Sequence, residues 1–560
     1  MGRTLFQYLF KDLVRIFLFS AVVLAGIMSF GGLLRPMTLY SLDALQVGEM
    51  WLYLMPAMMS YSLPIAAVFA TSMVYGRLSA DNELTGCRSA GIGYASICSP
   101  AIALGIFSAI LSLLFLGFVV PFFSLQAQKV IFANAAQLVA SDIERTHSFT
   151  PPSQGGRNAP TIFARRAVIP PTSGRGGEQV VILEQPTVLT YAKDAQDPSL
   201  QVPRVFFLAS KATLYIRQND EGEVQIWGVL EDASRFTRAL VSRSQGGIGY
   251  QAIGPINMPS PLEQNVKFMD IRRLKELAAD PEKSGRIRSA MREFIEQEQG
   301  TRILQGIVKA ATGSPEGFVF NTGEQGENPQ LIAPGASVRK EGSGDRKDGS
   351  GLLLTAGKEP IRILRKRGGG RTYEAKAASL HADIDNAAGV ADVTVELRDV
   401  GIPDPGGRID RKSEVQIYSI PMSDEIRVLQ KRNLSDYLHE EKPSAEPERK
   451  LMRQTIIARN EVLAEMHARA SFGVSCLVLV LVGAVLGMQF RSGDFLTAFS
   501  VSVIPAIITI TLVVAGTQSA RDVSDRTLQN PIWLGLTLIW LGNAIAAVLA
   551  LELYNRIRKT

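Results

Sequence analysis

Hydrophobic residues are concentrated near both ends of this chain, and polar residues fill its long middle. Three apolar runs lie before residue 124, and three more lie after residue 470. Each run is about as long as the roughly 20 residues that a helix needs to cross the hydrocarbon core of a bilayer. A helix also satisfies its own backbone hydrogen bonds, as a segment exposed to lipid must. We therefore predict six transmembrane helices, at residues 16–34, 50–75, 94–123, 471–490, 495–516 and 531–552.

The polar middle of the chain, residues 136–448, has the pattern of a β-rich domain. Short runs of β-branched and aromatic residues alternate with Gly, Pro, Asn and Asp, which is typical of strands joined by turns. Several short strands at this spacing predict a sandwich or a jelly roll. The runs lie at residues 179–183, 205–208, 212–216, 223–227, 351–355, 360–364 and 391–397.

Between the two groups of predicted strands, at about residues 270–350, the pattern changes. Residues 270–279 and 286–311 have helical patterns, and residues 321–350 are rich in Gly, Glu, Lys and Ser. The latter composition is typical of a flexible segment. We therefore predict a helical and flexible insertion within the β-rich domain.

The predicted organisation has three parts. Residues 1–135 contain transmembrane helices one to three, residues 136–448 form the β-rich domain, and residues 449–560 contain a connecting helix and transmembrane helices four to six. The connecting helix, at about residues 449–469, leads directly into the fourth span. The predicted fold class is a membrane protein with a 3+3 arrangement of α-helices and a large β-jellyroll-like domain between helices three and four.

Basic residues beside the spans predict the orientation in the membrane. The positive-inside rule assigns both termini and the polar segment at residues 76–91 to the cytoplasm, and the β-rich domain to the other side. The same excess explains the net charge of +6, because no nucleic-acid-binding signature accompanies it. The cytoplasmic side receives Arg3, Lys11, Arg15, Arg77, Arg88, Arg491, Arg556, Arg558 and Lys559, and the short loops of the other side receive Arg35, Arg521 and Arg526.

The sequence lacks the motifs of an enzyme that supplies its own energy. No GxxxxGK[ST] phosphate loop, GxSxG nucleophile turn or HExxH metal motif occurs in it. His381, Asp383 and Asp385 alternate along a predicted strand, but a solvated strand face explains them better than a metal site. We therefore predict no catalytic residue, cofactor or metal, and any energy for transport would come from a partner.

The polar segment at residues 76–91 predicts a short helix at the membrane surface. Ser79 is expected to cap its N-terminus, Glu83 suits the positive end of the helix dipole, Arg88 suits the other end, and Gly91 suits the stop. A helix of about three turns is marginal by itself and needs a surface to lie against. Two interpretations remain open here: a solvated connection, or a docking element for a cytoplasmic partner.

Two further groups of residues in the membrane region are candidates for contacts. Arg35, Arg521 and Arg526 lie at the outer ends of spans, where they would either pair with anionic lipid headgroups or extend to the water interface. Gly483 and Gly487 form a GxxxG face that permits close helix packing. This motif is frequent by chance in apolar sequence.

Three local motifs lie beside the predicted spans. They are Glu83-Leu84-Thr85 through Arg88-Ser89-Ala90-Gly91 after span two, Glu465-Met466-His467-Ala468-Arg469 before span four, and Asn530-Pro531 with Trp540-Leu541-Gly542-Asn543 in span six. Together with the architecture, they resemble the permease subunits of the bacterial lipopolysaccharide export machine, the LptF/LptG (YjgP/YjgQ) family. The resemblance covers about residues 1–140 and 450–560, and Gly542 stands where the family usually has Pro.

The resemblance implies a multi-pass protein of the bacterial inner membrane with cytoplasmic termini and a periplasmic β-jellyroll domain. It also implies a permease without ATPase activity that pairs with a second LptF/LptG-type permease above a cytoplasmic LptB-like ABC ATPase dimer. Lipopolysaccharide or a related glycolipid would then pass to an LptC/LptA-like periplasmic bridge protein. On the family's motif, the docking residues of a coupling helix at 77–91 would be Glu83, Thr85, Arg88 and Gly91.

An alternative from a different functional class is a membrane-anchored periplasmic scaffold or interaction protein without transport activity. Its β domain would bind periplasmic proteins, and glycolipid would not contact spans one or five. The predicted insertion at about residues 270–350 has no counterpart in the resemblance.

Overall fold

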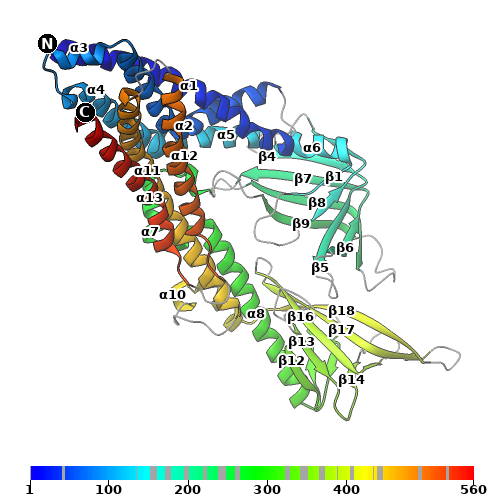
Figure 1. Ribbon diagram of the computed structural model, residues 1–560. Coiled ribbons are helices and arrows are strands. Elements are labelled where there is room, and N and C mark those ends of the chain that lie inside the picture. Colours follow the sequence, from blue (N-terminus) through cyan, green and yellow to red (C-terminus); the bar gives the residue numbers. More distant parts are fainter. Residues whose placement is uncertain are drawn as a thin grey trace.

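The computed structural model consists of a bundle of long helices with two β-rich parts to one side (Figure 1). Both termini and the short helix α3 (Glu83–Ser89) lie at the same end of the bundle (Figure 1). The structure describes the chain except at residues 1, 41–43, 134, 152–159, 171–177, 194–200, 219–223, 238–247, 259–264, 322–327, 341–350, 365–371, 387–388, 404–408, 433, 438–445, 490–494, 525–528 and 560.

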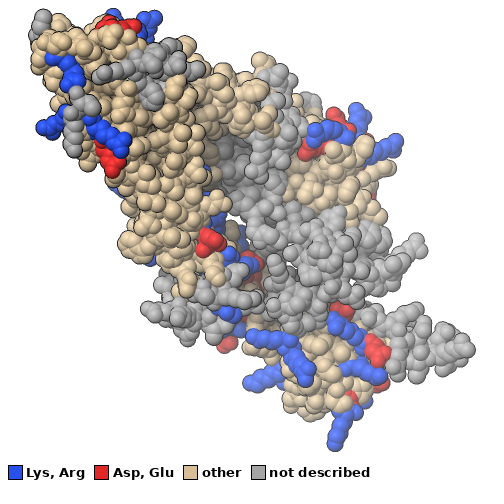
Figure 2. Space-filling view, in the orientation of Figure 1, with Lys and Arg blue, Asp and Glu red and all other residues tan. Residues whose placement is uncertain are grey.

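Six helices in the described part of the chain are long and apolar enough to cross a membrane. They coincide with the six predicted spans, so the prediction of six membrane helices is confirmed. On the face shown in Figure 2, the side of this bundle is largely uncharged, and charged side chains gather at the end with the termini. The helices are α1 (Gly2–Tyr40), α2 (Ala44–Ala80), α4 (Tyr94–Leu114) continued by the π-helical turn η1 (Phe115–Val119) into α5 (Val120–Ala133), α11 (Glu446–Gln489), α12 (Phe495–Ser519) and α13 (Ile532–Lys559).

The central helix of the bundle is α11, which packs against α2, α4, α12 and α13. Its membrane part is apolar on every side, as expected for a helix surrounded by others. Leu479, Val480 and Val482 are accordingly fully buried. The 44 residues of α11 span about 66 Å at 1.5 Å per residue. The predicted connecting helix and fourth span are therefore one continuous element.

The first β part has nine antiparallel strands covered by helix α6 (Ala135–Thr146). Its core combines Ile143 of α6 with inward-facing strand residues such as Val181 and Leu183, two positions apart on one strand. The sheet order is β1-β2-β5-β6-β8-β7-β4-β3, with β9 beside β8. The strands are β1 (Ser148–Phe149), β2 (Thr161–Phe163), β3 (Arg166–Val168), β4 (Glu178–Glu184), β5 (Thr187–Lys193), β6 (Gln201–Leu208), β7 (Lys211–Gln218), β8 (Val224–Thr237) and β9 (Ile248–Met258).

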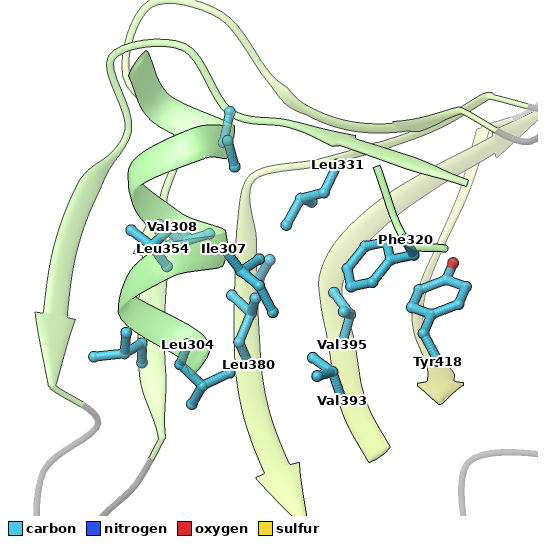
Figure 3. Packing of buried hydrophobic residues seen from close by; sticks show 14 of the residues in the cluster. Leu304, Ile307, Val308, Phe320, Leu331, Leu354, Leu380, Val393, Val395 and Tyr418 are labelled. Carbon is cyan, nitrogen blue, oxygen red and sulfur yellow. The ribbon is translucent and has the colours of Figure 1, made fainter. Parts of the chain in front are cut away.

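The second β part has a four-stranded sheet, β10-β11-β14-β15, and a five-stranded sheet, β12-β13-β16-β17-β18. Helix α8 (Gly285–Gly313) contributes Leu304 and Ile307 to its core, where they face the strands (Figure 3). Phe320 and Tyr418 stack with ring centroids 4.3 Å apart. The strands are β10 (Phe318–Val319), β11 (Gln330–Ile332), β12 (Ser337–Lys340), β13 (Leu352–Thr355), β14 (Ile361–Leu364), β15 (Thr372–Ala375), β16 (Ala377–Asp385), β17 (Val390–Pro403) and β18 (Ile409–Pro421).

The region predicted as one β-rich domain thus contains two separate hydrophobic cores. The helices predicted between the two groups of strands are confirmed as α7 (Ile271–Ala279) and α8. Part of the segment predicted as flexible forms β11 and β12, while residues 322–327 and 341–350 lie outside the described residues. The pattern of strand-forming residues along the sequence did not indicate which strands share a hydrophobic core.

Helix α8 connects the second β part to the bundle. Its second half lies in the β core, and its first half packs Ile287 and Phe294 against Leu451 and Ala458 of α11. The ion pairs Arg286–Glu461 at 2.8 Å and Lys450–Glu293 at 2.7 Å join the same two helices. Between the second β part and α11, the chain forms the short helices α9 (Asp424–Arg427), η5 (Val428–Lys431) and α10 (Leu434–Tyr437).

Candidate functional site

Helix α3 lies against the end of the bundle instead of projecting from it. Asn82, which precedes it, has a left-handed φ of 57° and turns the chain between α2 and α3. Leu84 is only 5% exposed and belongs to the core formed by α1, α2, α4 and α11, and Cys87 packs against the same core. This apolar side supplies the surface that a helix of seven residues needs.

The four residues predicted to dock a partner lie on the outer side of this element. Glu83, Thr85, Arg88 and Gly91 are all exposed. The Arg88 guanidinium lies 4.7 Å from the centroid of the Tyr94 ring, a cation–π contact that orients it. An anionic, a hydroxyl and a cationic side chain of this segment are thus each accessible from outside the bundle.

Gly91 is required by the backbone between α3 and α4. Its φ of +78° lies in the left-handed region, which glycine adopts without steric cost. An added Cβ would meet nothing within 4 Å, so no close contact demands this glycine. Its function in the structure is the turn into α4.

The predicted N-cap was wrong, and so were the bounds of the predicted helix at 77–91. Residues 77–80 are the last turn of α2, and α3 begins at Glu83. Ser79 is buried in α2, where its hydroxyl donates to the carbonyl of Met488 on α11 at 3.1 Å. Arg77 pairs with Asp12 of α1 at 2.7 Å. Tertiary contacts therefore extend α2 beyond the apolar run that the sequence pattern marked.

At the end of the bundle opposite the termini, an ionic cluster joins three elements. Glu461 of α11 lies 2.8 Å from Arg286 of α8 and 3.3 Å from Arg521, which follows α12. Arg521 is thus one predicted headgroup residue for which the structure supplies a protein partner. Arg526 and the side chain of Arg35 lie outside the described residues.

One turn further along α11, a buried ion pair lies within the bundle. The Glu465 and Arg469 side chains are 7% and 4% exposed and 2.9 Å apart. Arg469 also donates to the carbonyls of Val266 and Lys267 in the turn η3 (Val266–Phe268), at 3.0 and 3.1 Å. Both charges of the motif before span four are therefore used in internal contacts.

The second and third sequence motifs contact each other. The Trp540 indole N–H donates to His467 Nδ1 at 3.3 Å. The Asn543 amide donates to the Ser471 hydroxyl at 2.8 Å, and the Ser475 hydroxyl donates to the Asn543 carbonyl oxygen at 2.9 Å. These bonds fix α13 against α11 within the bundle, where unpaired polar groups are costly.

Glycines mark the closest helix contacts in the bundle. A Cβ on Gly487 would lie 2.9 Å from the Ser72 carbonyl oxygen, and one on Gly483 would lie 2.9 Å from the Val68 carbonyl oxygen, so α11 approaches α2 closely at both. Gly516 and Gly535, which no sequence motif marked, bring α12 against α13 in the same way. Gly542 likewise lies against Thr509 of α12.

Large apolar side chains cover the outer surfaces of α1 and α12. Phe19 and Ile27 of α1 are 72% and 67% exposed, and Ile504 and Ile507 of α12 are 56% and 54% exposed. Apolar patches of this kind mark a surface that contacts lipid or another apolar partner.

No group of three or more His, Cys, Asp or Glu side chains in the described residues lies close enough to hold a metal ion. His381 lies on β16 opposite Thr394, and the side chains of Asp383 and Asp385 lie outside the described residues. The described residues thus give no support to a metal site at His381, Asp383 and Asp385.

Sequence reasoning missed Asn460, Glu461 and Lys267, which form contacts at the end of the bundle opposite the termini. The fourth span was drawn from residue 471, so polar residues of the preceding helix were assigned to a stalk outside it. For Glu461, the available signal was its helical spacing with Glu465, because positions four apart share one face. Lys267 lies on a different element, η3, where no such pattern marks it.

These features define a multi-pass membrane protein with six membrane-length helices, one of them buried at the centre of the bundle, and β-rich parts attached at one side. A family model, the lipopolysaccharide export system permease LptF/LptG, matches residues 7–196 and 354–556. The match covers more than half of the chain, which therefore belongs to the LptF/LptG family. A comparison with curated proteins found no match.

As a member of this family, the chain is a multi-pass inner-membrane permease of lipopolysaccharide transport, and a transport subunit instead of a typical enzyme. Family membership implies a complex with other Lpt components. Residues 197–353, which include η3, α7 and α8, lie outside the two matched segments.

Proposed function

We propose that this chain extracts lipopolysaccharide or a related glycolipid from the inner membrane, powered by a separate LptB-like ABC ATPase dimer that docks on α3. The observation that carries this proposal is the two-sided character of α3. Exposed Glu83 and Arg88 offer charges of both signs to a partner, while Leu84 connects the helix to the core of the bundle. A partner that moves α3 would therefore also move α1, α2, α4 and α11.

The proposed orientation has both termini and α3 in the cytoplasm and the two β parts in the periplasm. Basic residues at the end with the termini support it, because short cytoplasmic segments carry an excess of Lys and Arg. On this orientation, the connection from α11 through α8 would transmit movement to the second β part.

Charge reversal tests the docking role. Glu83→Lys and Arg88→Glu together should lower the ATPase that copurifies with the chain by at least about tenfold, because reversal replaces attraction by repulsion. Arg558→Glu makes the same substitution as Arg88→Glu at another exposed position near the same end of the bundle, and it should leave copurification unchanged. An intact complex after both reversals on α3, with unchanged thermal unfolding of the chain, would reject this docking surface.

We further propose that the glycolipid enters beside α1 and α12, with Arg35, Arg521 and Arg526 near its headgroup. The exposed apolar surfaces of α1 and α12 support this. Photo-reactive residues at Phe19 and Ile507 should cross-link to lipopolysaccharide, whereas one at Ile110 of α4, which is 61% exposed, should not. Absence of cross-links from α1 and α12 would favour the membrane-anchored scaffold instead.

The remaining partners of the proposal are a second LptF/LptG-type permease and an LptC/LptA-like periplasmic bridge protein. Exposed apolar helix surfaces support a partner within the membrane, and the β parts offer strand edges of the kind that pair with another sheet. Purification in mild detergent with identification of every copurifying subunit tests both. Recovery of the chain alone under conditions that preserve other membrane complexes would contradict them.

A further inference from the structure

A cavity of about 660 Å³ lies at the outer end of α12. It has two cationic side chains, from different parts of the chain, and three neutral side chains that carry hydroxyl or amide groups. Groups of this kind bind phosphate and carboxylate oxygens. The lining residues are Lys267, Val514, Thr517, Gln518, Ser519, Arg521 and Asp522.

One hydrogen-bond donor of the Arg521 side chain is unpaired among the described residues. Its Nη1 lies 3.3 Å from Glu461, but its buried Nε has no partner among the described residues. Buried donors in proteins are almost always paired, so an unpaired one indicates an acceptor that the described residues do not supply.

The second cation, Lys267, comes from the turn η3, which lies outside the segments matched by the family model. Arg469 donates from Nη2 to the carbonyls of Val266 and Lys267, and the Ser124 hydroxyl donates to the carbonyl of Phe268 at 3.4 Å. The turn is therefore fixed by α11 on one side and α5 on the other. Arg469 is itself 4% exposed and has an Nη1 without a partner in the described residues.

Two carboxylates limit the positive charge at this place. Asp522 lines the cavity, and Glu461 pairs with Arg521. The lining residues alone carry two positive charges and one negative charge, and Glu461 is shared between Arg521 and Arg286. An excess of one positive charge suits a phosphodiester, which carries one negative charge, better than a multiply charged anion. The outer end of a membrane helix lies at the level of lipid headgroups, where phosphodiesters are abundant.

We propose that Lys267 and Arg521 form a binding site for the phosphodiester of an anionic phospholipid, and that Arg469 is the positioning residue that holds Lys267 in it. This assigns Arg521 to a resident membrane lipid in place of the transported glycolipid, so that Arg35 and Arg526 would be left near the headgroup of the glycolipid. Occupation would join η3 to the end of α12, and so connect the segment that lies outside the family match to the bundle.

Photo-cross-linking of the full chain in nanodiscs tests this site. A photo-reactive residue at Gln518 should cross-link to phosphatidylglycerol and much less to zwitterionic phosphatidylcholine. Lys267→Ala should lower the phosphatidylglycerol yield about tenfold, since a charge-assisted hydrogen bond is lost. Lys275→Ala, at an exposed lysine of α7, is the matched control and should change nothing.

Equal yields for the two lipids, or an unchanged yield in Lys267→Ala, would overturn the site. Loss of the cross-link on addition of millimolar inorganic phosphate would show that free phosphate occupies the cavity, and would overturn the assignment to a lipid. Cross-linking of lipopolysaccharide at Phe19 and Ile507 is measured in a separate experiment. A negative result for the phospholipid site can therefore be distinguished from a negative result for the transport proposal.

The positioning role of Arg469 has its own test. If Arg469 acts through Lys267, Arg469→Met should lower the cross-link at Gln518 in the wild-type background but not further in Lys267→Ala. Arg469→Lys, which keeps the charge but cannot donate to both carbonyls in the same way, should not restore it. Independent, multiplying effects of the two substitutions would reject positioning.

Discussion

The side-chain amide nitrogen of Asn460 on α11 lies 2.9 Å from the side-chain oxygen of Asn530, two residues before the start of α13. The same nitrogen donates to the carbonyl of Ala520 at the end of α12, at 2.8 Å. The Asn530 oxygen also accepts from the backbone N–H of Ile532 at 3.1 Å. One buried amide thus holds three helices together at the end of the bundle opposite the termini.

Replacing Asn460 by Ala should therefore destabilise the bundle by about 1–3 kcal/mol, since the buried carbonyl of Ala520 loses its hydrogen bond to this side chain. Thermal unfolding in nanodiscs measures this effect. Asn555→Ala, at an exposed position of α13, is the control and should change stability by less than about 0.5 kcal/mol. Equal effects of the two substitutions would show that the Asn460 contacts contribute little.

At the buried pair Glu465–Arg469, single and double replacement should change the free energy of unfolding by different amounts. Arg469→Met leaves a buried, unpaired carboxylate and should cost about 3–5 kcal/mol, whereas the double variant Glu465→Met/Arg469→Met should recover much of this loss. The pair Glu298–Arg302 on α8 has the same spacing but is exposed, so Arg302→Met should cost less than about 0.5 kcal/mol. Unfolding in denaturant checks all three, and a double variant no better than Arg469→Met would refute the explanation.

Glycine replacement tests the contact between α11 and α2. A Cβ on Gly487 would lie 3.0 Å or less from two backbone atoms of α2, so Gly487→Ala should destabilise by about 1–3 kcal/mol through overpacking. Gly306 lies inside α8 with nothing within 4 Å, so Gly306→Ala should instead stabilise by about 0.5–1 kcal/mol. Opposite signs in the thermal shift are expected, and equal signs would contradict the packing argument.

The parts of this fold that the sequence predicted are those that depend on local composition. The apolar runs marked all six membrane-length helices, because a lipid-exposed segment must be both apolar and helical. The helices at 270–279 and 286–311 were found from their periodicity in the same way. For the exposed positions on α3, the docking role itself is still a prediction.

The parts that sequence could not supply depend on contacts between distant residues. Ser79 has the local sequence context of a helix cap, but its hydroxyl hydrogen-bonds to Met488, which is 409 positions away in the sequence. Lys267 carries no motif, and its place beside Arg521 follows from the bonds that Arg469 makes to its turn. The division of the strands into two cores likewise depends on pairing across long sequence separations.

The connection through α8 gives a final prediction about local stability. In the first half of α8, Phe294 packs against α11, and in the second half, Ile307 lies in the core of the second β part. Phe294→Ala should cost about 3–5 kcal/mol and Ile307→Ala about 2–5 kcal/mol, each mostly within its own cluster. Hydrogen exchange should therefore rise near residues 285–298 and 449–458 in the first variant, and in the second half of α8 and its neighbouring strands in the second variant.

Lys450→Ala, which removes an exposed ion pair between the same helices, is the control and should barely change exchange. If Phe294→Ala and Ile307→Ala instead raise exchange over the same residues, α8 and both its neighbours open as one cooperative unit. Separate patterns would mean that the helix is fixed independently at its two ends, so that movement of α11 reaches the second β part through a helix that stays folded.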